Sequence, residues 1–261
     1  MNQRTALITG ACINTGVAIV NKFLSEGWRV VFTGRNPDKV NLAEEKYKNK
    51  FPNASVKGYC IDSLIDACTV NQKGIADIFD FLDKQNISID CLVLNAADQG
   101  LNMEIFKSPL TDFMRVINTN VVWNYALVEK TAERMKNVGG GSIVFVNSNT
   151  AYRAIPDRIA YETSKSAQLG MMRGLALDLG KYNIRVNAVL PGMIKTDRWE
   201  KNPAFYAQLP SRYTPLGDVA VGEDIADAVY YFAACSRNTT GAELVVDGGN
   251  MIQLYPIIPK E

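Results

Sequence analysis

The sequence predicts an α/β fold in which a doubly wound parallel sheet of about seven strands is covered by helices on both faces. The short β-branched runs are apolar throughout rather than alternating with polar residues, which is the pattern of parallel strands buried on both sides. Longer amphipathic stretches separate these runs to the end of the chain, as a repeated strand–helix order requires. No linker, repeat or low-complexity tract interrupts this order, so we expect one domain over residues 1–261.

The strands are expected where short apolar runs occur, at 6–9, 29–33, 55–61, 90–94, 142–146, 185–189 and 243–246. Helices are expected between them, at about 16–24, 37–50, up to 84, 112–135, 161–179 and 223–234. Pro37 suits the first turn of its helix because its missing N–H needs no partner there. The one irregular stretch, 192–218, contains three prolines and is long enough to suggest a functional loop.

Composition excludes several classes of function. The chain has 28 Lys+Arg and 27 Asp+Glu, so its net charge of +1 argues against a nucleic-acid or polybasic membrane partner. No run of apolar residues is long enough to span a membrane. There is no histidine, which excludes Ser–His–Asp and Cys–His triads and His-ligated metals, and we expect no metal site. Acid–base chemistry must therefore use Tyr, Lys, Asp, Glu or Cys.

The cysteines and the N-terminus indicate a reducing compartment. The five cysteines, an odd number without a C-x-x-C pair, are expected to be reduced, buried thiols. The N-terminal residues enter a short apolar run without the longer core of a signal peptide. We therefore expect a cytoplasmic protein.

A glycine-rich turn follows the first predicted strand and opens the first predicted helix, over residues 9–18. Glycine permits a tight turn and a close approach of the backbone to a ligand. The helix that follows directs its N–H groups and the positive end of its dipole towards an anion. This position favours a pyrophosphate site, although an ordinary strand-to-helix turn is the alternative.

The turn resembles the T-G-x-x-x-G-x-G motif of the short-chain dehydrogenase/reductase family, and the resemblance covers nearly the whole chain. Thr9, Gly10 and Gly16 match the motif, whereas Asn14 replaces its middle glycine. Asn tolerates positive φ better than other non-glycine residues, so the turn is expected to survive. The resemblance implies a Rossmann-type fold, an NAD(P) cofactor bound partly at Thr15, and likeness to 3-oxoacyl carrier-protein reductases.

The end of the second strand favours NADP(H), with NAD(H) as the other possibility. An NAD site places a carboxylate there, whereas this chain has Gly34 and then Arg35, a guanidinium suited to a 2′-phosphate. A surface role for Arg35 is the alternative. By resemblance, further cofactor contacts are expected at Asp62, Asn95, Ala96, Ala97, Pro191, Gly192, Ile194 and Thr196. Leu94 and Ala97 depart from the family's N-N-A-G sequence.

Tyr161 and Lys165 lie four residues apart, so their side chains share one face of the predicted helix. Ser148 ends the fifth strand 13 residues before Tyr161, which is the family's spacing, and Asn120 matches its mid-helix asparagine. The resemblance implies that Tyr161 exchanges a proton with a carbonyl oxygen and that Ser148 orients this oxygen. It also implies that Lys165 stabilises the phenolate and holds the cofactor, and that Asn120 keeps a relay water. Tyr161 and Lys165 are thus implied in both catalysis and cofactor binding.

The sequence leaves three candidate functions open. The first is an NADP(H)-preferring reductase or dehydrogenase that interconverts a small-molecule carbonyl and a secondary alcohol. The second is a catalytically weak scaffold or redox sensor, and the third an epimerase or dehydratase using the same tyrosine. Enoyl reduction is disfavoured because its Y-x6-K spacing would need a tyrosine at Arg158.

The substrate region and the assembly are indicated by resemblance alone. Residues of about 193–218 resemble the family's substrate lid, and its rings at Trp199 and Tyr206 suggest an apolar substrate surface or simple anchoring of the lid. Tyr152 lines the pocket or packs in its loop. A homotetramer, or a homodimer, is implied.

Overall fold

The computed structural model describes residues 3–257 and contains one parallel sheet. Its strands follow the order β3-β2-β1-β4-β5-β6-β7, and each neighbouring pair is parallel. The strands are β1 (Thr5–Ile8), β2 (Arg29–Gly34), β3 (Val56–Cys60), β4 (Cys91–Leu94), β5 (Gly141–Val146), β6 (Ile184–Pro191) and β7 (Glu243–Val246). The predicted doubly wound α/β fold is confirmed.

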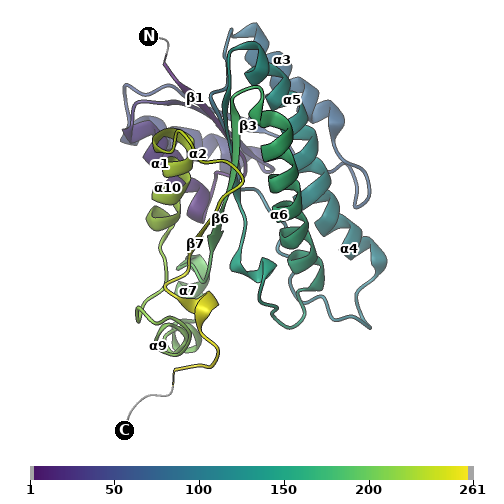
Figure 1. Ribbon diagram of the computed structural model, residues 1–261, viewed down its shortest axis with the longest axis vertical. Helices are drawn as coiled ribbons and strands as arrows, with labels where there is room; N and C mark the ends of the chain where they lie inside the picture. Colours follow the sequence, from purple (N-terminus) through teal and green to yellow (C-terminus); the bar gives the residue numbers. More distant parts are fainter. Residues whose placement is uncertain (1–2, 258–261) are drawn as a thin grey trace.

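Helices cover the two faces of this sheet (Figure 1). On one face lie α1 (Asn14–Ser25), α2 (Pro37–Lys50) and α10 (Gly222–Tyr230), which continues into η3 (Tyr231–Cys235). On the other lie α3 (Gln72–Lys84), α4 (Leu110–Ile117), α5 (Trp123–Asn137) and α6 (Ile159–Gly180). Each layer of helices buries its own apolar core against the sheet, with Phe23 and Val229 on the first side and Leu127 and Met172 on the second.

Local chemistry explains why the predicted ends of α2 agree with the structure. The Asn36 side chain accepts a hydrogen bond from the Lys39 amide at 2.9 Å, and Pro37 occupies the first helical position. This is the arrangement that satisfies the free N–H groups of a helix start. The helix therefore begins at Pro37 and ends at Lys50.

The helix expected over 112–135 differs from the structure. It is divided by η1 (Asn118–Val122), a π-helical turn in which the Trp123 amide donates to the Asn118 carbonyl oxygen five residues back. π-Helical turns are rare and have no simple hydrophobic period. An amphipathic pattern that includes such a turn therefore predicts one continuous helix. The predicted site residue Asn120 lies within this turn.

The irregular stretch is more ordered than expected. It forms three short helices, α7 (Asp197–Lys201), α8 (Pro203–Tyr206) and α9 (Leu209–Tyr213), which lie at the same end of the molecule as the carboxyl end of β6 (Figure 1). Prolines begin α8 and occupy the first turn of α9, so they start helices here rather than prevent them. Short capped helices of this kind are not resolved by hydrophobic periodicity.

The cysteine prediction was partly wrong. All five cysteines are free, as expected, but only Cys91 is buried. Cys60, Cys68 and Cys235 are exposed and Cys12 is half-buried, because they lie at strand or helix ends and in loops rather than in strand interiors. Burial raises the pKa of the Cys91 thiol to about 12.

The order of the strands reverses between β1 and β4, because β2 follows on one side of β1 and β4 lies on the other. Connections on the two sides run over opposite faces of the sheet, so the carboxyl ends of β1 and β4 open into a crevice between them. Ligands of doubly wound sheets bind at this point. No helix within residues 3–257 combines the length and the apolar character needed to cross a bilayer.

The edge of the sheet depends on a buried carboxylate. Glu44 on α2 accepts a hydrogen bond from the Gly58 amide of β3 at 2.7 Å, and the ammonium groups of Lys48 and Lys57 also lie close to its carboxylate.

Glu44→Ala removes the acceptor of a buried N–H, so we expect the free energy of unfolding to fall by about 1–3 kcal/mol. Urea denaturation measures this loss. Glu45→Ala, on the exposed side of the same helix, is the control and is expected to change it by less than about 0.5 kcal/mol. Equal effects of the two substitutions would contradict this role.

Candidate active site

The turn between β1 and α1 is fixed by the neighbouring strand β4. The Asn95 side-chain amide donates to the carbonyl oxygens of Thr9 and Gly10, at 3.0 and 2.9 Å. In return, the buried Thr9 hydroxyl accepts from the amides of Asn95 and Ala96, both at 3.0 Å. Two strand ends at the crevice are thereby joined by four hydrogen bonds. Leu94, the departure noted in the sequence, is buried in the core and takes no part in this link.

The glycines of the turn are required by close contacts. Gly10 has a φ of 65°, and a Cβ there would lie 2.7 Å from the Cα of Ala96. A Cβ on Gly16 would lie 2.4 Å from the Gly10 carbonyl oxygen. Asn14 has a φ of 47°, the left-handed conformation expected for it, and its side-chain oxygen accepts from the Asp197 amide of α7 at 3.5 Å. Asn14, which stands where the motif has its middle glycine, thus connects the turn to the start of α7.

The residues of the turn fit an anionic group. The helix α1 begins without a side-chain cap and without an acidic residue in its first turn. Its first N–H groups and dipole are therefore available to a pyrophosphate. Thr15 lies in this first turn and is half-buried. On the other side, the Tyr47 hydroxyl donates to the Ala11 carbonyl oxygen at 2.5 Å, which anchors the turn to α2.

Arg35 and Asp62 follow the carboxyl ends of neighbouring strands β2 and β3, and both are exposed. They therefore share the edge at which the adenosine half of a dinucleotide is expected. Lys39, in the first turn of α2, lowers the pKa of the Cys12 thiol, whereas burial and Cys60 raise it more strongly. Lys39 is thus a second cation within electrostatic range of this edge, one that the motif alone does not identify.

Lys165 is the most constrained charged group of the site. Its side chain is only 2% exposed, and its Nζ donates to the Val146 carbonyl oxygen at 2.9 Å and to Gln168 Oε1 at 3.2 Å. Val146 ends β5, so the ammonium is held against the carboxyl end of this strand. Burial lowers the pKa of Lys165 to about 7, because an ammonium removed from water loses solvation.

Two cations lie close to the ring of Tyr161. Lys165 Nζ is 5.5 Å from the centre of its ring, and the Arg158 guanidinium carbon is 5.4 Å from it. Tyr161 and Lys165 lie on α6, where the spacing of four places them on one face, and Arg158 immediately precedes this helix as its N-cap residue. Arg158 also donates to the Gln99 carbonyl oxygen at 2.9 Å, which connects this face to the loop after β4.

Ser148 follows β5 and is buried. Its Oγ accepts hydrogen bonds from the Thr150 amide at 3.2 Å and from the Thr150 hydroxyl at 2.9 Å. A hydroxyl has two acceptor positions and one donor proton, so the proton of Ser148 is left for another acceptor. The Ser148 amide donates to Asn147 Oδ1 at 2.7 Å, and Asn147 Nδ2 donates to the Lys165 carbonyl oxygen at 2.9 Å. Asn147 therefore ties the serine to α6.

Asn120 is fully buried, and each of its polar atoms has a protein partner. Its side chain accepts from the Asp98 amide at 2.7 Å and donates to the Asp98 carbonyl oxygen and to Ser164 Oγ, at 2.8 and 2.9 Å. Its carbonyl oxygen accepts from Gln168 Nε2 at 2.7 Å and from Asn124 Nδ2 at 2.8 Å. Asn120 thus joins η1, α6 and the loop after β4.

The remaining predicted residues lie at the carboxyl ends of β4 and β6 or in the lid. Ala96 and Ala97 follow β4 directly; Pro191 ends β6, and the Gly192 amide donates to the Val246 carbonyl oxygen at 3.0 Å. Ile194 and Thr196 follow, and both are half-buried.

The three predicted substrate residues divide into two groups. Trp199 of α7 and Tyr206 of α8 stack with ring centres 4.9 Å apart. Tyr152 is 55% exposed and donates its hydroxyl proton to Glu243 Oε2 at 2.6 Å. The structure therefore brings Trp199 and Tyr206 together and directs Tyr152 towards β7.

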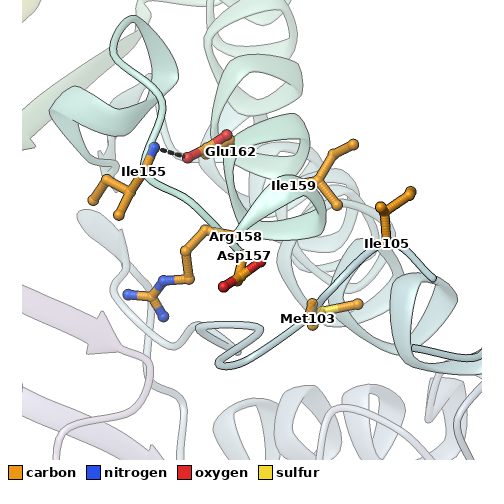
Figure 2. Close-up of a pocket in the computed structure, with 7 residues that line it drawn as sticks. All are labelled: Met103, Ile105, Ile155, Asp157, Arg158, Ile159 and Glu162. Atoms are coloured by element: carbon orange, nitrogen blue, oxygen red, sulfur yellow. Dashed lines mark hydrogen bonds between the residues drawn. The ribbon is translucent and has the colours of Figure 1, made fainter. Parts of the chain in front are cut away.

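Sequence reasoning missed Gln168 and Asn147. Both are polar residues at positions where the hydrophobic pattern predicts burial, which is the signal that would have found them. It also missed a cavity of about 420 Å³ beside the start of α6 (Figure 2). The cavity is lined by Met103, Ile105, Ile155, Asp157, Arg158, Ile159 and Glu162.

The chain is similar to known proteins over nearly its whole length. The family model described as "Enoyl-(Acyl carrier protein) reductase" matches residues 10–250. A 3alpha-hydroxysteroid dehydrogenase of Mediterraneibacter gnavus is 30% identical, over 95% of this chain and 97% of its own length. The 3-oxoacyl-acyl-carrier-protein reductase FabG of Buchnera aphidicola is 31% identical, over 95% of this chain and 98% of its own.

The fold is also similar to that of solved structures. The solved structure described as ElxO with NADP bound superposes with a TM-score of 0.85 and 26% identity, and covers 97% of this chain and 100% of its own. Relatives of such coverage and the matching family model show the family. The chain belongs to the short-chain dehydrogenases/reductases and is an NAD(P)-dependent oxidoreductase.

Proposed function

We propose that the protein is an NADP(H)-preferring oxidoreductase that interconverts a carbonyl and a secondary alcohol, with Tyr161 as its acid–base group. One observation carries this proposal: Tyr161 lies over a buried ammonium, Lys165, at the strand end that Ser148 follows. A phenol, a hydroxyl and an ammonium so arranged can donate a proton to an oxygen and stabilise the charge left behind.

The role of Tyr161 follows from its surroundings. A free phenol ionises near pH 10, so the phenolate needs stabilisation before it can accept a proton near neutral pH. The two cations beside its ring, Lys165 and Arg158, favour the phenolate electrostatically. Tyr161 therefore donates its proton in reduction and regains one in oxidation.

Ser148 orients the reacting oxygen. Because Thr150 occupies both of its acceptor positions, its hydroxyl donates to the substrate oxygen rather than to the protein. This contact fixes the carbonyl relative to Tyr161 and stabilises negative charge that develops on its oxygen. Asn147 keeps the serine in place through the Ser148 amide.

The cofactor fits the opposite part of the crevice. The turn of Thr9, Gly10, Asn14, Thr15 and Gly16 and the uncapped start of α1 would hold its pyrophosphate. Asp62, and the strand ends at Asn95 and Gly192, would hold the adenosine, ribose and nicotinamide parts. When bound, the reduced nicotinamide supplies the hydride.

The preference for NADP(H) is supported by charge. Arg35 follows β2 without a carboxylate beside it, and Lys39 adds a second cation at this edge. A guanidinium binds a phosphate in a bidentate manner, which the unphosphorylated ribose of NAD(H) cannot match. The relative ElxO is described with NADP bound.

The substrate is proposed to be a small molecule that meets the lid of residues 193–218. The stacked rings of Trp199 and Tyr206 support an apolar substrate surface. Carbonyl rather than enoyl reduction is favoured because the residue seven positions before Lys165 is Arg158, whose guanidinium lies against the Tyr161 ring.

A single domain and a homotetramer, or a homodimer, complete the proposal. The exposed apolar side chains Leu110 of α4 and Leu177 of α6 support assembly through these helices. The cytoplasmic location expected from the sequence stays a prediction.

Replacing Tyr161 tests the proposed chemistry. Tyr161→Phe removes only the hydroxyl, so we expect kcat to fall by about 10²–10⁴-fold while cofactor affinity stays near normal. Steady-state turnover on a carbonyl panel and fluorescence titration with NADPH measure the two effects. Tyr231→Phe, on η3 beyond the amino-terminal end of β5, is the matched control and is expected to keep full turnover. Near-normal turnover of Tyr161→Phe would refute the assignment.

Replacing Arg35 tests the cofactor preference. Arg35→Ser removes a charged hydrogen bond to the 2′-phosphate, so we expect NADPH affinity to fall about 10–100-fold while NADH affinity changes little. Fluorescence titration with each cofactor measures this, with the exposed Arg237→Ser as the control. Equal losses for both cofactors, or none, would show that Arg35 does not read the phosphate. Binding of neither cofactor by the unaltered protein would favour the scaffold function instead.

A further inference from the structure

Gln168 occupies the space between Lys165 and Asn120. It lies one residue short of a full turn after Lys165 on α6 and is only 1% exposed. Its Oε1 accepts from Lys165 Nζ at 3.2 Å, and its Nε2 donates to the Asn120 carbonyl oxygen at 2.7 Å. One carboxamide thus connects the ammonium of the active site directly to the π-helical turn η1.

The orientation of this carboxamide is fixed by its partners. At one end, its oxygen faces two groups that can only donate, Lys165 Nζ and Asn147 Nδ2, the latter at 3.1 Å. At the other end, its nitrogen faces a carbonyl oxygen, which can only accept. The reversed orientation would set the amide nitrogen against two donors and the amide oxygen against an acceptor, so only one arrangement satisfies all three partner groups.

We propose that Gln168 is a positioning residue of the active site, which holds the Lys165 ammonium beneath Tyr161 and couples it to Asn120 and to Asn147, the residue before Ser148. The inference rests on the proposed function in one respect: the ammonium must act on Tyr161. The contacts themselves concern only the residues of this chain.

The proposal follows from the donors of Lys165. An ammonium has three N–H groups, and two of them are directed to Val146 and Gln168. These two acceptors lie on different elements, so together they restrict the direction of the third N–H. The ring of Tyr161 is within 5.5 Å, and the cofactor is expected beside it. Gln168 therefore determines where the remaining proton of the ammonium points.

The Gln168 carboxamide joins Lys165 to the Asn120 carbonyl oxygen, a connection for which the family resemblance implies a relay water. Here the Asn120 carbonyl oxygen already accepts from Gln168 and Asn124, and the ammonium is reached through a side-chain amide. A carboxamide orients its neighbours but does not pass protons along as water does. Lys165 is thus held on this side by the protein itself.

The surroundings of Lys165 bear on its charge. The titratable and charged groups beside the network are Tyr161 on α6, Arg158 at the N-cap of α6, and Asp98, which contacts Asn120 through its backbone and is paired with Arg115 of α4. Burial lowers the pKa of Lys165 to about 7. A hydrogen-bond acceptor stabilises the charged form of an amine, so we expect the loss of the Gln168 oxygen to lower this pKa further.

Two substitutions of similar volume test the proposal. Gln168→Met removes the acceptor, so we expect the Lys165 pKa to fall by about 1–2 units. Gln168→Glu keeps an acceptor and adds a negative charge, so we expect the pKa to rise by at least about one unit. NMR titration of protein carrying ¹³C at the lysine ε-carbon measures both, with Lys165→Arg used to assign the signal. Gln72→Met and Gln72→Glu, at an exposed position on α3, are the controls and are expected to leave the Lys165 titration unchanged.

Kinetics provide the second readout. In the direction of alcohol oxidation, we expect Gln168→Met to lower kcat about tenfold, with KM for the alcohol within about twofold of normal. We also expect the acid limb of kcat/KM to move to higher pH, because a neutral Lys165 stabilises the phenolate less. A residue that only fills space would move neither the Lys165 titration nor the pH profile in Gln168→Met.

The outcomes separate this inference from the proposed function. Opposite pKa shifts in the two variants support the positioning role, even if no carbonyl substrate is turned over. A Lys165 titration within about 0.3 units of normal in Gln168→Met would overturn it, even if the protein is an active reductase. If Gln168→Met does not fold, the sign of the shift in Gln168→Glu decides, and no rise would overturn the inference.

Discussion

The site depends on one buried ammonium. Lys165 is removed from water between β5 and α6, and a lone buried charge would be costly without partners. Two acceptors, the Val146 carbonyl and the Gln168 carboxamide, offset this cost and fix the position of Nζ. Burial also strengthens the electrostatic interaction, because in a medium of low dielectric constant a cation acts strongly on the phenol beside it. The rest of the site is arranged around this contact, because Asn120, Asn147 and Ser148 are each one or two hydrogen bonds away.

The other half of the crevice is fixed by a different network. Asn95 and Thr9 join the ends of β1 and β4, and this link holds the turn in a shape that admits no Cβ at Gly10 or Gly16. Asn14 then connects the turn to the start of the lid through the Asp197 amide. A cofactor bound in the turn would therefore be close to α7, which belongs to the proposed lid. The two networks meet at the carboxyl ends of the strands, where a doubly wound sheet binds its ligands.

Much of this arrangement is predictable from sequence because it rests on local patterns. Short apolar runs predict the strands, and Pro37 predicts the start of α2. The spacing of Tyr161 and Lys165 places them on one helical face without knowledge of the fold. The π-helical turn at Asn120 is not predictable in this way, because it alters the helical period over only five residues. Gln168 was missed for another reason: its role depends on contacts with η1 and β5, which are far from it in sequence. The cysteines show the same limit, since burial depends on where the chain turns.

We propose that the chain moves a hydride between a nicotinamide and a carbonyl carbon, with the protein supplying the proton. The most direct test is to incubate the protein with NADPH deuterated at C4 of the nicotinamide and a panel of carbonyl compounds, and to analyse the products by mass spectrometry and NMR. We expect an alcohol whose carbinol carbon carries the deuterium, in an amount equal to the cofactor consumed. Conversion of a compound without net consumption of cofactor, as by an epimerase or dehydratase, would contradict it, and so would tight NADPH binding with no transfer to any member of the panel.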